Sequence, residues 1–175
     1  MDHDRADSEF RDFVASRLDR LRRLAFLMCG DMHRAEDAVQ LALAKLYAVW
    51  FRVEPDSLDA YVRRIVINTV KTQYSRLWTK REHCTSATPE RAAGDSNART
   101  ADRVAILEAL ARLPRRQRAV VVLRFWEDRS VAETAEIMRC SQGAVKSHTS
   151  RGLGKLRDLL SDTYSLEGMV VPCRT

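Results

Sequence analysis

The residues of this chain that are best suited to recognition chemistry lie between positions 139 and 157. This stretch contains no Asp or Glu and five basic side chains: Arg139, Lys146, Arg151, Lys155 and Arg157. The DNA backbone carries dense negative charge, so a helix that enters a groove must be free of carboxylates. The pattern therefore favours DNA binding over catalysis.

Residues 130–160 predict a helix-turn-helix that would position these basic groups. Ser130 and Glu133 have the spacing of a capping box at the start of a short first helix, and Ser141 is placed to cap the second. The small side chain of Ala135 would let the two helices approach closely, and Val145 would be the buried anchor of the second helix. Three leucines continue the inward stripe: Leu153, Leu156 and Leu160.

The amino-terminal half of the second helix is left with an outward polar face. Its groups suit phosphates and base edges in a major groove: Gln142, Gly143, Lys146, Ser147, Ser150 and Arg151. An ordinary solvated face would explain the charge alone, but the caps and packing positions favour DNA. One residue departs from the pattern. Arg139 stands where the turn commonly has Gly, and a left-handed non-Gly residue costs about 1 kcal/mol.

A second basic segment covers residues 61–81, again without an acid, and aromatic side chains lie within it or nearby. Its basic residues are Arg63, Arg64, Lys71, Arg76, Lys80 and Arg81, and the aromatic residues are Trp50, Phe51, Tyr61, Tyr74 and Trp78. Basic groups follow a nucleic-acid backbone and aromatic rings stack on unpaired bases, so the combination suits single-stranded nucleic acid. The alternative is that the aromatic residues are core. Asn68 is either a base reader or a buried hydrogen-bonding group.

The segment near residues 31–50 differs because its polar face has no basic excess. Its outward groups, Arg34, Glu36, Asp37, Gln40 and Lys45, lie beside apolar Leu41. This face indicates either a surface for a protein partner or a plain amphipathic helix.

The apolar periodicity predicts an all-α protein of two small helical domains joined by a flexible linker, the C-terminal domain being the helix-turn-helix. Single helices are expected over about residues 8–29, starting at a Ser8 cap, then from an Asp31 cap to residue 50, and over 58–78. In the second domain, helices are expected from residue 102 to the residue before Pro114, and again from Pro114. We assign residues 1–81 and 102–161 to the domains, 82–101 to the linker and 162–175 to a disordered tail.

Composition limits the remaining possibilities. The net charge of +6 and the pI near 9.5 are compatible with a polyanionic partner. The four cysteines have no C-x-x-C spacing, so we expect no metal, cofactor or disulfide framework. A nuclease would require clustered carboxylates or histidines, and none are evident, so the chain is not expected to be an enzyme. With no signal peptide or apolar span, a cytoplasmic protein is expected.

Three segments together resemble the extracytoplasmic-function group of bacterial RNA polymerase sigma factors, and their residues are most similar to those of the SigE-type subgroup. GDMHRAEDAVQLALAKLYAVW looks like the family's core-polymerase-binding segment, and DAYVRRIVINTVKTQYSR looks like its −10 segment. LARLPRRQRAVVVLRFWEDRSVAETAEIMRCSQGAVKSHTSRGLGKLR looks like its −35-reading domain. The resemblance implies a factor that binds core RNA polymerase, recognises −35 and −10 elements and aids strand opening.

The resemblance also implies roles for particular positions. The polymerase β′ coiled coil would be contacted by Arg34, Glu36, Asp37 and Gln40, although Leu41 stands where many members have an acid. A loop over residues 50–57, beginning at Trp50, would pocket a flipped −10 base. The non-template strand would be held by Arg63, Arg64, Asn68 and Lys71. The −35 element would be faced by Gln142, Lys146, Ser147, Ser150 and Arg151. The helix from Pro114 would lie near the β flap, and an anti-sigma factor is a possible further partner.

One other class of DNA-binding protein fits part of the pattern. A conventional transcription regulator would also bind duplex DNA through its C-terminal domain, but it would need a sensory or dimerising first domain. The acid-free basic segment at residues 61–81 argues against that alternative.

Overall fold

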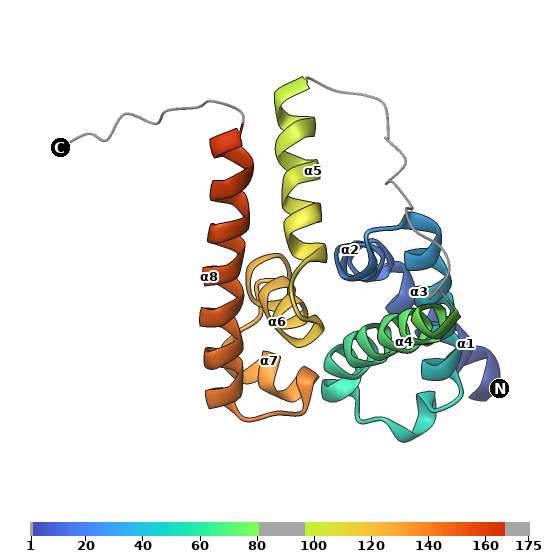
Figure 1. Ribbon diagram of the computed structural model, residues 1–175. Coiled ribbons are helices and arrows are strands. Elements are labelled where there is room, and N and C mark those ends of the chain that lie inside the picture. The colour runs from blue at the N-terminus through green and yellow to red at the C-terminus, as the bar shows by residue number, and fades with distance from the viewer. Residues whose placement is uncertain (1, 81–96, 167–175) are drawn as a thin grey trace.

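The computed structural model describes residues 2–80 and 97–166, and within these residues it contains eight α-helices, two short 3-10 helices and no strand (Figure 1). The all-α prediction is therefore confirmed. The first domain holds α1 (Asp2–Ala15), α2 (Leu18–Cys29), α3 (Met32–Tyr47) and α4 (Leu58–Lys80), with η1 (Trp50–Arg52) and η2 (Pro55–Ser57) between the last two. The second holds α5 (Asn97–Ala111), α6 (Arg115–Phe125), α7 (Val131–Met138) and α8 (Gln142–Leu166).

The prediction of one helix over residues 8–29 was wrong, because the chain bends between α1 and α2. Arg17 leaves the helical conformation at φ −125° and ψ −13°. Its guanidinium lies over the Phe13 ring at 4.1 Å and donates from Nε to Asp59 Oδ1 at 3.2 Å. Ser8 is an exposed residue inside α1 and caps nothing. A tertiary contact with the start of α4 thus accompanies the bend.

The next two elements follow their local signals closely. Gly30 ends α2 in the left-handed conformation at φ 74°, where Gly carries no steric cost. Asp31 caps α3, since its Oδ1 accepts the Arg34 N–H at 3.0 Å. Helices α2, α3 and α4 then pack against one another around buried residues such as Leu24 and Val66.

The domain limits expected from composition differ from the helix bounds. Helix α5 begins at Asn97, inside the expected linker, and α8 continues past residue 161 to Leu166. The rest of the expected linker, residues 82–96, and the expected disordered tail from residue 167 lie outside the described residues. Helices α5 and α8 lie side by side, and in the view of Figure 1 α6 and α7 lie below α5 and beside the lower half of α8.

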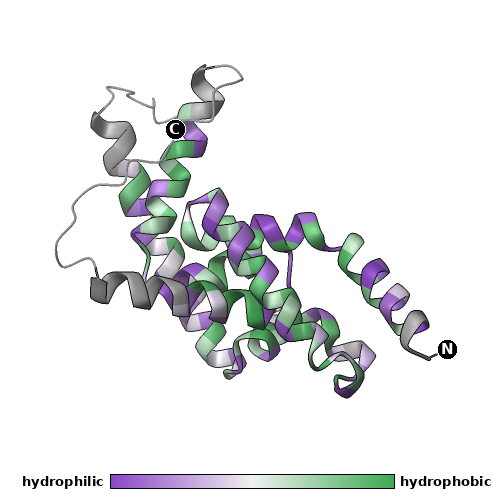
Figure 2. Ribbon diagram, turned by 90° about the vertical axis from the view of Figure 1, so that its right-hand side faces the viewer, coloured by the Kyte–Doolittle hydropathy of each residue, from purple (hydrophilic) through white to green (hydrophobic). Residues whose placement is uncertain are grey.

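The two domains pack directly against each other rather than standing apart. Helix α2 contacts α5 and α6, and α4 contacts α7. One continuous apolar cluster contains side chains of both domains, including Leu24, Val66, Leu110 and Ile137. Figure 2 shows the hydrophobic positions gathered where helices face one another. A shared core of this kind resists separation because opening it would expose apolar surface to water.

One buried arginine ties helix ends across the domain boundary. Arg118 of α6 donates from Nη1 to the Met28 carbonyl at 2.7 Å, and from Nη2 to the carbonyls of Ala111 and Leu113. The last carbonyls of a helix have no partner within the helix, so this guanidinium satisfies groups at the ends of both α2 and α5.

Candidate nucleic-acid and polymerase interfaces

The helix-turn-helix is built by the local signals found in the sequence. Ser130 N–H donates to Glu133 Oε2 at 2.7 Å while Glu133 N–H donates to Ser130 Oγ at 3.1 Å, which is the predicted capping box. The backbone and side-chain hydrogen bonds from Ser130, followed by that from Arg129, lower the pKa of Glu133 from 4.5 to about 2. Ser141 Oγ accepts the Ala144 N–H at 3.1 Å and caps α8 as expected.

The turn between α7 and α8 has the expected strained residue. Arg139 adopts the left-handed conformation at φ 48° and ψ 56°, the region that favours Gly. Its backbone N–H bonds back to the last turn of α7, at the carbonyls of Ala135 and Glu136. The turn thus aims the start of α8 away from α7.

The buried side of α8 matches the predicted inward-facing apolar residues only in part. Val145 is fully buried against Val120 and Ala135, as predicted. Leu153 was expected to face inward, but it is exposed. Gly152 faces inward instead, because a Cβ at this position would come within 2.7 Å of Val121 Cγ2 on α6. The close approach of α6 and α8 therefore depends on the absence of a side chain at residue 152.

This packing leaves the predicted DNA face of α8 open. All five predicted −35 residues are exposed: Gln142, Lys146, Ser147, Ser150 and Arg151. They lie at i, i+4, i+5, i+8 and i+9 along the first turns of a capped helix, so they share one side of it. The face presents cationic and hydroxyl donors without a carboxylate, which is the chemistry that phosphates and purine edges require.

The predicted −10 face of α4 is divided by burial. Asn68 and Lys71 are exposed, and Arg64 is half-buried, with its guanidinium over the Tyr61 ring at 4.7 Å. These three residues line a cleft of about 320 Å³ between the domains. The other basic groups around the cleft come from the second domain: Arg115, Arg116, Arg118 and Arg139.

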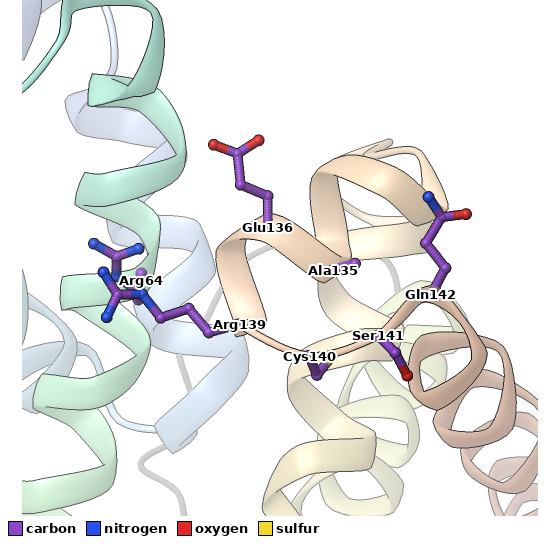
Figure 3. A pocket seen from close by; sticks show the side chains of 7 residues that line it. All are labelled: Arg64, Ala135, Glu136, Arg139, Cys140, Ser141 and Gln142. Atoms are coloured by element: carbon purple, nitrogen blue, oxygen red, sulfur yellow. The ribbon is translucent and has the colours of Figure 1, made fainter.

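Arg64 and Arg139 bring positive charge together from the two domains. Figure 3 shows the guanidinium of Arg139, at the end of α7, directed toward that of Arg64 on α4, with Glu136 above them. Burial, followed by the charge of Arg139, lowers the pKa of the Arg64 guanidinium. The like charges of Arg64 and Arg139 oppose the closed packing of the domains, and the nearby carboxylate of Glu136 offsets part of this repulsion.

Arg63 faces the second domain and not solvent, although it was predicted to contact the −10 strand. Its side chain is 1% exposed. The Nε group donates to Glu127 Oε2 at 3.0 Å, and Nη1 donates to the Asp59 carbonyl at 3.2 Å and pairs with the Asp59 carboxylate. In this arrangement of the domains, the guanidinium is not available to DNA.

Arg63 belongs to a network that we call the interdomain ion-pair cluster, formed by Arg17, Asp59, Arg63, Glu127, Arg129 and Glu133. Two ion pairs join the domains, and each domain supplies the arginine of one pair and the carboxylate of the other. Arg63 of the first domain binds Glu127 of the second, and Arg129 of the second binds Asp59 of the first at 2.9 Å. Arg129 also binds Glu133 at 3.0 Å, which links the cluster to the capping box.

Asp59 is the central carboxylate of this cluster. Burial raises its pKa, but the hydrogen bond and charge of Arg63, then the charge of Arg129 and the hydrogen bond of Arg17, outweigh burial and leave the pKa below its usual value. The carboxylate therefore stays ionised near neutral pH.

Sequence reasoning missed Asp59, Glu127 and Arg129. A signal for Asp59 exists, because it is the last acid before the acid-free stretch and stands four residues before Arg63, a spacing that places both on one helix face. No local pattern identifies Glu127 as the distant partner of Arg63.

Trp50, also predicted at the −10 site, packs against α1. Its ring is half-buried and meets Phe10 edge-on at a centroid distance of 5.1 Å and Phe13 at 5.3 Å. The Trp50 ring thus contributes to the packing against α1, whereas the neighbouring residue Phe51 is 69% exposed.

The outer face of α3 carries the residues predicted to bind polymerase. Asp37 and Gln40 are exposed, whereas Glu36 and Arg34 are half-buried, with Arg34 Nε 3.5 Å from Asp31 Oδ2. Leu41 is 47% exposed beside them. An exposed apolar side chain flanked by polar groups is typical of a surface that binds a protein.

The remaining chemistry-bearing groups form no further site that the structure describes. Among the side chains that the structure describes, no three His, Cys, Asp or Glu are grouped to hold a metal ion. Cys29 and Cys140 are partly buried free thiols, and burial raises the pKa of Cys29. The His83–Cys84 pair lies outside the described residues. None of the described helices has the length and apolar character needed to cross a bilayer.

Comparison with known proteins identifies the protein family in which these two faces occur. The family described as Sigma-70 region 2 matches residues 13–80, and the family described as Sigma-70, region 4 matches residues 103–156. The chain belongs to the RNA polymerase sigma factors. The sigma factor's first matched region contains α3 and α4, and its second contains the helix-turn-helix.

Its relatives identify the group. The sigma factor is 40% identical over 153 residues to RNA polymerase sigma-E factor of Streptomyces coelicolor, a match that covers 87% of the chain and 86% of the relative. It is 32% identical over 143 residues to the ECF RNA polymerase sigma factor SigM of Mycobacterium tuberculosis, covering 80% of the chain and 71% of SigM. The extracytoplasmic-function assignment and the SigE-type resemblance are confirmed.

Solved structures share the arrangement of helices. The sigma factor RpoE of Bartonella quintana, in complex with the anti-sigma factor NepR, matches with a TM-score of 0.71 and 26% identity, covering 87% of this chain and 97% of RpoE. CnrH, in complex with the cytosolic domain of CnrY, matches with a TM-score of 0.66 and 22% identity over 89% of this chain and 90% of CnrH, and shows the shared fold. The predicted function is thereby confirmed: the protein is a transcription initiation factor that directs core RNA polymerase to promoters.

Proposed function

We propose that the sigma factor divides promoter recognition between α8, which reads the −35 duplex, and α4 with the loop before it, which holds the −10 non-template strand. The outer face of α3 binds the β′ coiled coil of core polymerase. The observation that carries this proposal is the exposure of all five predicted −35 residues on one side of α8.

The α8 face suits a closed duplex. Lys146 and Arg151 are exposed cations, and Gln142, at the first position of the helix, can reach base edges near its amino end. The partial positive charge of the helix amino terminus favours phosphate nearby. In this proposal the start of α6, at Arg115 after Pro114, lies near the β flap of the polymerase.

The α4 face suits an opened strand. Arg64, Asn68 and Lys71 recur at i, i+4 and i+7, so they form one strip along the helix. The loop at residues 50–57 supplies Trp50 and Phe51 as rings for an unstacked base. Extruding a base costs roughly a few kcal/mol, and capture by ring and polar groups would offset that cost. Arg63 joins this strip only when the domains separate.

Polymerase makes the two weak DNA contacts cooperative. Once α3 is docked through Asp37 and Gln40, the second domain searches for its element within reach of the first, so binding becomes intramolecular. The sigma factor itself makes or breaks no bond, and it works in the cytoplasm, where core polymerase and the chromosome are. A partner of the anti-sigma class would compete for the same α3 face.

Run-off transcription with core polymerase on a genomic library tests the assignment. Lys146→Ala with Arg151→Ala is expected to reduce promoter-specific initiation about 100-fold, because each lost contact is worth about 1–3 kcal/mol. The matched control is Lys155→Ala with Arg157→Ala, which removes the same charge from exposed positions farther along α8. It should stay within about threefold of the parent.

Binding to core polymerase is measured in parallel. The α8 variants should keep it, whereas Asp37→Ala should weaken it, and Asp19→Ala, which removes an exposed acid from α2, should not. Loss of polymerase binding by the α8 variants with promoter choice intact would overturn the proposed division.

A further inference from the structure

Arg63 can occupy only one of two environments. In the closed packing its guanidinium is buried between Glu127 and Asp59, with both carboxylates within hydrogen-bonding distance. A phosphate of the −10 strand would need the same N–H groups, because an arginine fork that is filled by carboxylates has no donors left in that direction. Binding to Glu127 and binding to DNA therefore exclude each other.

The cross-domain pairs are placed where they control separation. The Glu127 side chain is 6% exposed and Arg63 is 1% exposed, so both charges are held out of water and depend on each other. The reciprocal pair of Arg129 with Asp59 lies in the same cluster. A buried charge that loses its partner is strongly destabilised, so the closed packing is favoured as long as both pairs are intact.

We propose that the interdomain ion-pair cluster is a latch that keeps the free sigma factor closed and withdraws Arg63 from DNA, and that docking on core polymerase opens it. Separation of the domains by the polymerase breaks both cross-domain pairs and transfers Arg63 to the phosphate backbone of the −10 strand. This inference rests on the proposed role of α4, and it adds the regulation of that face.

A second feature makes the latch reversible. Arg64 and Arg139 face each other across the same boundary, and their mutual repulsion opposes the attraction within the cluster (Figure 3). Polymerase then has to supply less free energy to separate the domains than the ion pairs and the shared apolar core alone would require. Closed sigma factor leaves the α8 face exposed, so the latch acts on strand capture and not on duplex reading.

The test uses two variants of the full chain that change the net charge in opposite directions. Glu127→Gln removes the cross-domain partner of Arg63 and adds one positive charge, while Arg129→Gln removes the cross-domain partner of Asp59 and subtracts one; the pairs within the first domain remain. Glu108→Gln and Arg103→Gln are the matched controls, since both residues are exposed on α5. Small-angle X-ray scattering gives the radius of gyration, and fluorescence anisotropy gives the affinity for labelled oligodeoxythymidine.

Both latch variants should expand and bind the single strand more tightly. Loss of one buried partner is expected to shift opening about tenfold, and the apparent affinity should rise roughly three- to tenfold because a larger fraction is competent. The controls should match the parent. With core polymerase bound, initiation by the latch variants should stay within about twofold of the parent, which also shows that they fold.

Unchanged dimensions and strand affinity in both latch variants would overturn the latch. Affinity that rises in Glu127→Gln and falls in Arg129→Gln, in step with net charge, would overturn it equally. If the parent with core polymerase initiates nowhere, the proposed function fails, but the scattering result still decides whether the cluster holds the domains together.

Discussion

Helices α4 and α8 carry the same sequence signal but expose it differently. Both are basic and poor in acids over the stretch predicted to meet DNA. On α8 every predicted contact residue is exposed, whereas on α4 Arg63 is buried beneath the second domain and Arg64 is half-buried. The two faces of one DNA-binding protein are therefore not equally available in the free molecule.

The difference has a physical origin in whether the interactions that set each face lie within one domain or between the two. The α8 face is oriented by contacts inside the second domain: the capping box at Ser130, the turn at Arg139, the cap at Ser141 and the close packing of Gly152 against α6. The α4 face is set by Glu127, which is 64 residues from Arg63 along the chain. Contacts within one domain act in any arrangement of the domains, whereas a partner from the other domain acts only while the domains touch.

The sharpest test of this contrast compares one basic residue from each face. Arg63→Ala leaves Glu127 without its cation and should lower the free energy of unfolding by about 3 kcal/mol, or less if water reaches the carboxylate as the domains separate. Lys146→Ala, on the exposed α8 face, should change it by under about 0.5 kcal/mol. Urea denaturation followed by circular dichroism measures both. Equal losses would remove the distinction between the two faces.

A glycine pair tests whether close packing against α6 orients α8. Gly152→Ala should destabilise the protein by about 1–3 kcal/mol, because the added Cβ would press on Val121 Cγ2. Gly154→Ala, two residues along, meets nothing within 4 Å and should stabilise the helix by about 0.5–1 kcal/mol. Thermal melts of the two variants should therefore shift in opposite directions, and shifts of the same sign would contradict the packing argument.

The capping box predicts how the helix-turn-helix responds to acid. The Glu133 carboxyl has a pKa of 4.5 when unperturbed and about 2 when folded, so the unfolded chain takes up the proton first. Its stabilisation is complete above about pH 4.5 and is lost as the pH falls through about 2. Glu133→Gln should remove about 1 kcal/mol at pH 7 and flatten this part of the acid titration. Glu136→Gln, which removes the same charge from the same helix outside the capping box, is the matched control.

The smallest expected effect concerns the turn. Arg139→Gly should raise stability by about 0.5–1 kcal/mol, because φ 48° costs Gly nothing. The same substitution at Arg157, inside α8, should instead lower stability by about 1 kcal/mol. A lower melting temperature for Arg139→Gly would show that its side chain contributes more than the backbone strain removes.

Much of the local architecture could be predicted. Caps at Asp31, Ser130 and Ser141 lie where the spacing of polar and apolar residues placed them, as does the left-handed turn at Arg139. These features depend on residues within a few positions of each other, so a linear pattern contains the information. The basic faces and the sigma-factor family were also readable from the sequence.

Failures occurred where a distant contact overrides a local pattern. Helix continuity over residues 8–29 is broken at Arg17, which binds Asp59. The apolar stripe of α8 turns so that Gly152, not Leu153, meets α6. In each case an interaction with a residue more than twenty positions away decided the outcome.

The sequence by itself determined an all-helical sigma factor with a capped, acid-free reading helix, because capping, periodicity and charge are local properties of the chain. Only the tertiary structure decided which cations face solvent. Burial of a charge depends on whether an opposite charge from another part of the chain lies within hydrogen-bonding distance, and Arg63 met that condition at Glu127 while Lys146 and Arg151 remain exposed.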